Sequence, residues 1–190
     1  MTSPLDPIAV AALVAGTLER LGILHTIGGS IASSIAGEPR TTVDIDVVVA
    51  IDESGIPAIL HAFEEDFYVD EDALRRAVRD RASTNLIHQA SQIKVDIHVA
   101  GGTPLDSQQL ERRRAVEIAP GQTLHVHPPE DILLQKLRWY RKGGEVSDRQ
   151  WRDIVGIVRV QGERLDREYL QRHAPVLGVT DLLERALAQA

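Results

Sequence analysis

Two segments in the middle of the chain alternate between apolar and polar residues, which is the pattern of a half-buried β-strand. In one segment the alternating aliphatic residues are Val43, Ile45, Val47 and Val49. In the other they are Ile93, Val95, Ile97 and Val99. Each segment predicts a strand whose aliphatic side chains face a core and whose polar side chains face the opposite way.

Apolar residues at helical spacing predict helices on both sides of these strands. The clearest stripe lies in residues 6–21 and consists of Val10, Leu13, Val14, Leu18 and Leu21. Further helices are predicted over 55–65, 71–81, 106–112, 130–142, 147–160, 166–173 and 179–189, and further strands over 23–27, 84–89, 115–118 and 123–127. The strand over 84–89 is expected to pair with its successor as a hairpin. The chain is therefore predicted to be an α/β (α+β) protein, with a sheet flanked by helices.

Pro128-Pro129 is the best boundary in the sequence, because consecutive prolines interrupt both helices and strands. Residues 1–128 are predicted to form an α/β core. Residues 129–190 are predicted to form a helical C-terminal region packed on that core. A chain of 190 residues with 43% hydrophobic residues is long and apolar enough for this arrangement.

Three aspartates lie on the polar faces of the two alternating strands. Asp44 and Asp46 share one face, with Cα atoms ~6.5–7 Å apart. Asp96 lies between Lys94 and His98 on the polar face of the second strand. Carboxylates this close repel each other unless a cation neutralises them, and oxygen ligands suit Mg²⁺ or Mn²⁺. If the strands are neighbours, the three acids converge and can hold two metal ions for phosphoryl transfer, with His98 beside them.

Gly28-Gly29-Ser30 predicts a phosphate-binding turn upstream of these acids. The two glycines permit positive φ angles and a close approach of the backbone to phosphate. Ser30 begins a predicted helix that runs to Ala36, and its hydroxyl and backbone N–H can donate to phosphate with the helix dipole behind them. The alternative for Ser30 is a plain N-cap.

The order of these elements resembles the DNA polymerase beta-like nucleotidyltransferase superfamily, through Gly29-Ser30, Asp44, Asp46 and Asp96. The resemblance implies the mixed sheet of that superfamily. Residues 37–44 are similar to the branch that holds the abortive-infection nucleotidyltransferase toxins. That branch implies a helical Lys136 and a later basic-Asp element, which residues 149–153 match only in part because Gln150 stands where an acid is common.

The resemblance implies a metal-dependent nucleotidyltransferase. Such an enzyme moves a nucleoside monophosphate from a nucleoside triphosphate to an acceptor hydroxyl and releases pyrophosphate. The resemblance assigns metal binding and catalysis to Asp44, Asp46 and Asp96, with Asp96 as the base toward the acceptor. It assigns the nucleotide contacts to Gly28, Gly29, Ser30, Arg40 and Lys136.

Three interpretations of the function stay open. The toxin-like branch implies an RNA acceptor such as tRNA, or a protein hydroxyl, and an antitoxin protein as partner. A small-molecule acceptor, as in the antibiotic nucleotidyltransferases, is the second. The third is a catalytically idle module that binds nucleotide or acts like an antitoxin, against which the intact set of acids argues.

Several polar residues have a second interpretation. Lys136 has apolar neighbours on its helix and could extend to water instead of phosphate. Asp153 could form a structural ion pair with Arg149, one turn away. His125 and His127 lie two residues apart on a predicted strand, but no third zinc ligand is evident beside them.

Composition narrows the setting of the chain. The absence of cysteine excludes disulfide and thiolate chemistry. The net charge of −7 argues against indiscriminate nucleic-acid binding, although Arg112–Arg114 with Arg138 and Arg141-Lys142 could form a local basic patch. The N-terminus lacks a basic leader region, and no apolar run approaches ~18 residues. The chain is therefore expected to be cytoplasmic, with no membrane association.

Overall fold

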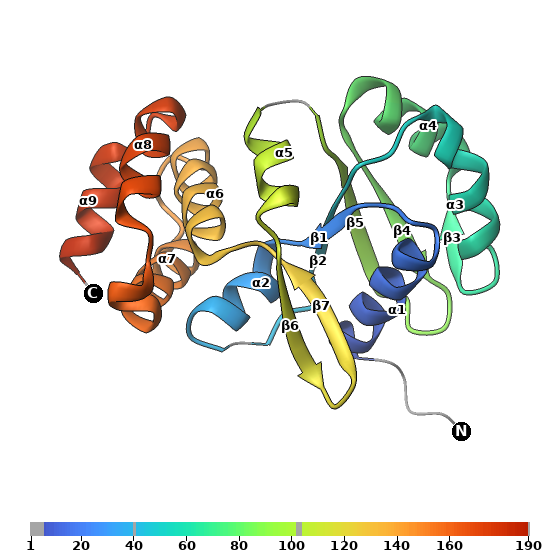
Figure 1. Ribbon diagram of the computed structural model, residues 1–190, viewed down its shortest axis with the longest axis horizontal. Helices are drawn as coiled ribbons and strands as arrows, with labels where there is room; N and C mark the ends of the chain where they lie inside the picture. The colour runs from blue at the N-terminus through green and yellow to red at the C-terminus, as the bar shows by residue number, and fades with distance from the viewer. Residues whose placement is uncertain (1–5, 40, 102–103, 190) are drawn as a thin grey trace. The chain divides into compact units, whose positions relative to one another are not determined.

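The computed structural model describes residues 6–39, 41–101 and 104–189. The chain divides into two compact units (Figure 1). The first unit runs to Ile31 and continues from Thr41 to His127, and it contains the sheet. The second unit consists of the segment that begins at Ala32 and of the chain from Pro128 onward, and its elements are helical.

The first unit is built on a seven-stranded mixed sheet in the order β3-β4-β5-β2-β1-β7-β6. The strands are β1 (His25–Ile27), β2 (Ile45–Val49), β3 (Phe67–Val69), β4 (Ser83–His88), β5 (Lys94–Val99), β6 (Arg114–Ala119) and β7 (Gln122–Val126). The β2–β5 and β1–β7 pairs are parallel, and the other neighbouring strands are antiparallel. The predicted mixed α/β fold is confirmed, and so is the β4–β5 hairpin.

Burial in β2 follows the predicted alternation from Ile45 onward. Ile45 and Val47 are fully buried, whereas Asp46 between them is partly exposed. Val43 was expected in the same core face, but its side chain is 66% exposed. The prediction for Val43 is wrong because the ladder between β2 and β5 starts at the Ile45–Val95 pair, so residue 43 lies outside it.

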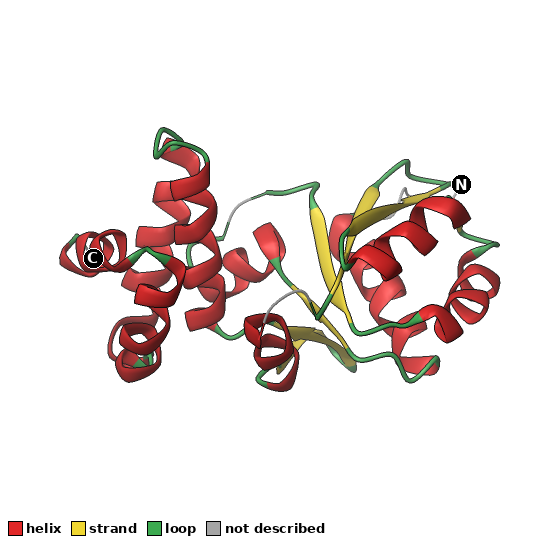
Figure 2. Cartoon of the chain, turned by 90° about the horizontal axis from the view of Figure 1, so that it is seen from above, coloured by secondary structure: helices red, strands yellow, loops and turns green. Residues whose placement is uncertain are grey.

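Three helices of the first unit form a layer against the sheet. Helix α1 (Pro7–Arg20) contacts β1 and β7, α4 (Glu71–Asp80) contacts β4 and β5, and α3 (Ile56–Phe63) contacts both of these helices. Figure 2 shows these helices in red beside the yellow strands. Helix α1 begins where the Asp6 side chain accepts a hydrogen bond from the backbone N–H of Ala9 at 2.8 Å. Helix α5 (Pro104–Glu111) contacts β1.

The second unit contains α6 (Pro129–Lys142), α7 (Asp148–Gln161), α8 (Arg167–Leu177) and α9 (Thr180–Ala188), together with the end of α2 (Gly29–Ala36). Helix α6 contacts the three helices that follow it. The core of the second unit is formed by fully buried side chains, among them Leu133, Leu134, Leu137, Ile154 and Leu170. The helical character of this region follows from its apolar periodicity.

Two features of the fold escaped sequence reasoning. Strand β3 has only three residues at the edge of the sheet, with Phe67 buried and Tyr68 60% exposed, and three residues are too few to show a period of two. Helix α8 was expected to end at residue 173, but it runs to Leu177 and includes Pro175. Gly178 ends it with a φ of +66°, as expected for a C-terminal glycine cap.

Candidate functional site

Two of the three predicted acids lie side by side where the central strands β2 and β5 begin. This end of the strands, not an edge strand, is called the acidic edge of the sheet below. Because β2 and β5 are parallel and in register, Asp46 is directly paired with Asp96. Their side chains are 30% and 29% exposed. Asp44 lies one residue before β2 and is exposed, and its backbone N–H donates to the Thr42 hydroxyl oxygen at 3.2 Å. The sheet thus brings two carboxylates onto adjacent strands with Asp44 immediately upstream.

A lysine ammonium group lies against this acidic edge. Lys94 Nζ is 2.8 Å from Asp96 Oδ1. The hydrogen bond and the negative charge of Asp96 raise the pKa of Lys94, and Asp44 and Asp46 add to the increase. All three carboxylates therefore favour the charged form of Lys94.

His98 connects Asp46 to the neighbouring strand β4. Its Nε2 lies 3.2 Å from Asp46 Oδ1, and its Nδ1 lies 2.7 Å from the hydroxyl oxygen of Ser83. These distances fit a tautomer in which Nε2–H donates to the carboxylate and Nδ1 accepts from the hydroxyl. His98 holds Asp46 in place, in the position beside the acids that was expected from the shared face with Asp96.

The Gly28-Gly29 turn lies directly against Asp46. The backbone N–H of Gly28 donates to the carbonyl oxygen of Asp46 at 2.9 Å. Gly29 has a φ of +54°, and a Cβ atom added to it would lie 1.8 Å from Asp46 Oδ2. Only glycine fits this position, because both the backbone angle and the close approach exclude a side chain.

Ser30 follows this turn inside the first turn of α2. The helix spans Gly29–Ala36, which places Ser30 at its second residue. The positive φ of Gly29 turns the chain one residue earlier than the sequence suggested. Ser30 is half-buried, and its backbone N–H belongs to the first turn of the helix, where N–H groups lack intrahelical acceptors.

His127 also belongs to this site, although the sequence analysis did not predict it there. It follows β7, is 3% exposed, and lies 3.2 Å from the position of a Cβ atom added to Gly28. Burial lowers the pKa of His127 to about 4, with Asp46 acting in the opposite direction and His98 in the same direction. Its Nε2 has no hydrogen-bond partner among the described residues. The available signal in the sequence was its position at the end of the predicted strand over 123–127.

The two other predicted nucleotide contacts are Lys136 and Arg40. Lys136 lies in the second unit, where its Nζ donates to Asp153 Oδ2 at 2.8 Å. Both side chains are largely buried, with 13% and 10% exposed. Arg40 lies outside the described residues. The role of Lys136 toward phosphate stays a prediction, and Asp153 has Lys136 as a partner.

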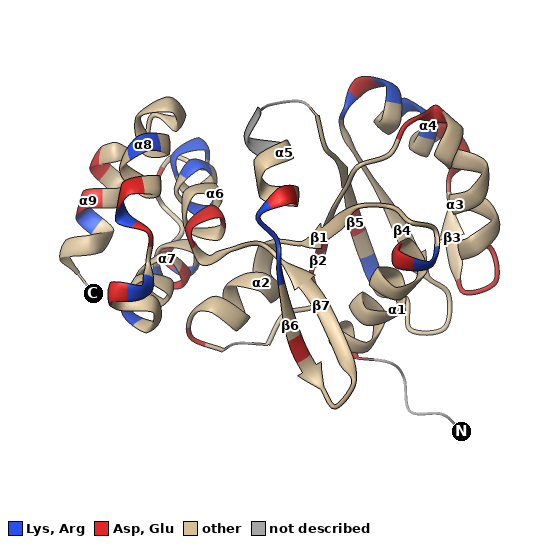
Figure 3. Cartoon of the chain, in the orientation of Figure 1, with Lys and Arg blue, Asp and Glu red and all other residues tan. Residues whose placement is uncertain are grey.

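Basic and acidic residues are interspersed along the described chain (Figure 3). Of the arginines expected in a basic patch, Arg141 forms ion pairs with Asp181 at 2.6 Å and with Glu145 at 2.8 Å. Arg113 donates to the carbonyl oxygen of Leu110 at 2.9 Å. These two guanidinium groups already have protein partners, so each contributes less to a basic surface than its charge alone suggests.

The residues at the sheet edge fit a divalent cation. The donor set is made of carboxylate oxygens, which are the ligands that Mg²⁺ and Mn²⁺ prefer. The ammonium group of Lys94 occupies a position beside Asp96 that a cation favours. The backbone of Gly29 lies directly against the Asp46 carboxylate at the start of α2, and the backbone N–H groups at a helix start favour a bound phosphate.

Comparison with solved structures shows the class of fold. No protein-family model and no curated protein sequence matches the chain. An antigenic nucleotidyltransferase-like protein from Paracoccidioides brasiliensis superposes with a TM-score of 0.61 at 20% identity, covering 98% of this chain and 95% of that one. The antibiotic-resistance factor ANT(2'')-Ia superposes with a TM-score of 0.53 at 12% identity, over 90% and 96%. The lincosamide antibiotic adenylyltransferase LnuA superposes with a TM-score of 0.51 at 12% identity, covering 77% of this chain and 93% of that one.

The chain thus has the nucleotidyltransferase fold, and the resemblance inferred from the Gly-Ser and aspartate pattern is confirmed at the level of the fold. The similarity to the toxin branch stays a prediction. None of the described helices is long and apolar enough to cross a membrane.

Proposed function

We propose that the chain is a metal-dependent nucleotidyltransferase. The observation that carries the proposal is the set of acids at the sheet edge, where Asp46 and Asp96 are in register and the Gly28-Gly29 turn lies against Asp46. The nucleotidyltransferase fold supports the same conclusion. Asp44, Asp46 and Asp96 would hold Mg²⁺ or Mn²⁺, which when bound neutralises triphosphate and leaving-group charge.

The roles of the protein groups follow from their positions. The backbone of Gly29 and the Ser30 hydroxyl hold the terminal phosphates of the nucleoside triphosphate at the start of α2. Asp96 accepts the proton of the acceptor hydroxyl. The acceptor oxygen then forms a bond to the α-phosphorus, the bond between the α- and β-phosphates breaks, and pyrophosphate leaves. Most of the rate enhancement in this scheme comes from positioning and from electrostatic stabilisation.

Two acceptor classes are proposed, and each has its own support. The sequence similarity to the toxin branch favours an RNA acceptor such as tRNA, or a protein hydroxyl, with an antitoxin protein as partner. The superposition on ANT(2'')-Ia and on LnuA, which has been solved with lincomycin bound, favours a hydroxyl of a small molecule such as an antibiotic. A catalytically idle nucleotide-binding module is the non-enzymatic alternative.

Incubation with each labelled nucleoside triphosphate and Mg²⁺ or Mn²⁺ tests this function. Total RNA, lysate protein and a panel of aminoglycosides and lincosamides serve as acceptors. We expect label transfer with one acceptor class and its loss in Asp46→Asn. Asp66→Asn, an exposed acid elsewhere in the first unit, is the matched control and should transfer at the wild-type rate. Nucleotide binding without transfer to any acceptor would instead identify an idle module.

A further inference from the structure

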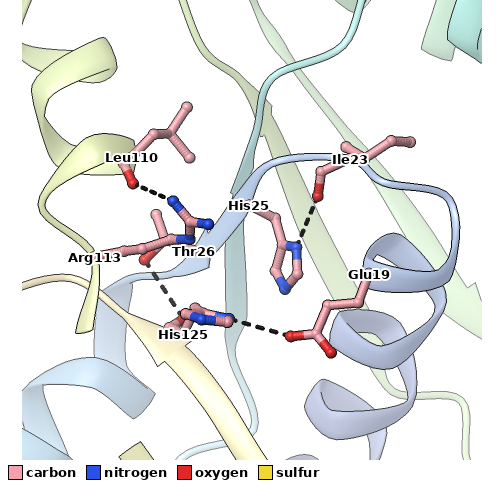
Figure 4. Close-up of polar contacts among 7 residues, drawn as sticks. All are labelled: Glu19, Ile23, His25, Thr26, Leu110, Arg113 and His125. Carbon is pink, nitrogen blue, oxygen red and sulfur yellow. Dashed lines mark hydrogen bonds and ion pairs between the residues drawn. The ribbon is translucent and has the colours of Figure 1, made fainter. Parts of the chain in front are cut away.

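A second cluster of potential metal ligands lies in the first unit. Glu19 in the last turn of α1, His25 in β1 and His125 in β7 each offer one ligand atom, and these atoms all lie within 4.8 Å of one another. His125 Nδ1 is 3.1 Å from Glu19 Oε1. Figure 4 shows the His25 ring directed toward the space between the Glu19 carboxylate and the His125 ring.

His25 supplies an independent reason to expect a ligand. Its side chain is 2% exposed, and its Nδ1 donates to the carbonyl oxygen of Ile23 at 3.0 Å. Its Nε2 is buried and has no hydrogen-bond partner among the described residues. A backbone acceptor at Nδ1 leaves the lone pair on Nε2, which is the arrangement that orients a metal-binding histidine.

We propose that Glu19, His25 and His125 form a binding site for a divalent transition-metal ion of the Zn²⁺ class. Two imidazole nitrogens and one carboxylate oxygen are a donor set that Zn²⁺ uses with water as its fourth ligand. Mg²⁺ is disfavoured because imidazole nitrogen is a poor ligand for it. The guanidinium group of Arg113, which acts on His25, already donates to the carbonyl oxygen of Leu110 at 2.9 Å.

This cluster is distinct from the acidic edge of the sheet. Along β1, His25 is paired with Val49, whereas Gly28 at the other end of the strand donates to Asp46. A metal at the cluster would tie α1 to β1 and β7. Strand β1 leads into the Gly28-Gly29 turn, and β7 leads into His127. The ion would therefore stabilise the strands that position the nucleotide site without taking part in transfer.

The test is a calorimetric titration with Zn²⁺ of protein that has been treated with a chelator and freed of it. Excess Mg²⁺ is present throughout so that it competes for the carboxylates of the acidic edge. We expect one Zn²⁺ per wild-type chain. Glu19→Gln and His125→Gln should each weaken Zn²⁺ binding by more than about tenfold, since even outer-shell losses cost 10–100-fold. Both residues are partly exposed, so these variants should fold even if His25→Gln does not. Asp46→Asn should retain the Zn²⁺ affinity.

His61→Gln is the matched control. His61 Nδ1 is 2.9 Å from Glu64 Oε1, the same kind of pair as His125 with Glu19, but both side chains are exposed at the C-terminal end of α3. We expect the His61→Gln variant to bind Zn²⁺ with the wild-type affinity. We also expect Zn²⁺ to raise the melting temperature of wild type and not that of Glu19→Gln. Equal Zn²⁺ affinity in wild type, Glu19→Gln and His125→Gln would overturn the proposal, whatever the outcome of the nucleotide-transfer assay.

Discussion

At the scale of single residues, the contact between Gly29 and Asp46 governs the candidate nucleotide site. The position of a missing Cβ atom lies 1.8 Å from a carboxylate oxygen, far inside van der Waals contact. His98 holds the other oxygen of the same carboxylate at 3.2 Å, so Asp46 is restrained from both sides. Any side chain at residue 29 must therefore displace either the turn or the proposed metal ligand.

Gly29→Ala should weaken triphosphate binding by more than about tenfold, or ~1.4 kcal/mol, because its methyl group displaces Asp46. The control is Gly121→Ala in the β6–β7 turn, where φ is +74° and no heavy atom lies within 4 Å of the added Cβ. That variant should lose about 1 kcal/mol of stability through its backbone angle alone. Calorimetric titration with a Mg²⁺–nucleoside triphosphate compares the two. Equal triphosphate affinities of Gly29→Ala and Gly121→Ala would place the Gly28-Gly29 turn away from the phosphates.

Asp96→Asn separates the proposed base from the nucleotide-holding acids. We expect triphosphate affinity to stay within about tenfold of wild type, and transfer to fall by a factor of ~10² or more, the usual scale for an acid–base group. Because this change also breaks the ion pair with Lys94, Lys94→Met is the control. Binding and single-turnover transfer are measured on each protein. Transfer near the wild-type rate in Asp96→Asn contradicts the three-acid mechanism.

At the scale of secondary-structure elements, strand direction assembles the site. The parallel strands β2 and β5 both start at the acidic edge, and the antiparallel β1 ends there. Strand β7 runs parallel to β1 and so delivers His127 to the same edge. The residues of the site are thus spread over a hundred positions of sequence, yet they meet because four strand ends coincide.

The α6–α7 pair poses a separate question, which is whether Lys136 serves the structure or the substrate. Lys136→Met leaves the largely buried Asp153 carboxylate without the ammonium group, and we expect a loss of about 3 kcal/mol in the free energy of unfolding. The double variant Lys136→Met with Asp153→Leu should recover part of that loss.

Urea unfolding measures these stabilities, and triphosphate titration of the double variant addresses the phosphate role. If Lys136 is structural only, the double variant binds triphosphate as wild type does. A loss of more than about tenfold in affinity with stability restored would assign Lys136 to the nucleotide.

At the scale of the whole molecule, the stability of the fold depends on pH through His127. Its folded-state pKa is lowered to about 4 from 6.5, so between these values the unfolded chain binds the proton and the folded chain does not. Stability is therefore fully present above pH 6.5 and falls as the pH drops toward 4. The expected contribution is a loss of about 2 kcal/mol between pH 7.5 and pH 5.

His127→Leu should lack this part of the pH dependence. The measurement is the free energy of unfolding in urea at both pH values, with a chelator present to keep metals away from the site. Other groups titrate in the same range, but they are common to both proteins and cancel in the difference. Parallel pH profiles for wild type and His127→Leu would show that His127 is protonated in the folded state as readily as in the unfolded one.

The sequence by itself determined the mixed α/β class, most of the helices and strands, and the three acids with their glycine turn. These features rest on local periodicity, which a strand of five or six residues or a helix of eight or more displays within its own segment. The same reasoning failed at Val43 and at strand β3. Val43 alternates correctly but lies outside the ladder, and β3 is too short to alternate.

Only the tertiary structure decided which distant residues meet. The pairing of Asp46 with Asp96, the contact between Gly29 and Asp46, and the arrival of His127 depend on strand order and register. The same holds for His125, whose sequence neighbours suggested no third zinc ligand, while the fold places Glu19 and His25 beside it. Local periodicity specifies the face of a strand on which a side chain lies. It does not specify which strands become neighbours, because that depends on long-range packing and hydrogen bonding.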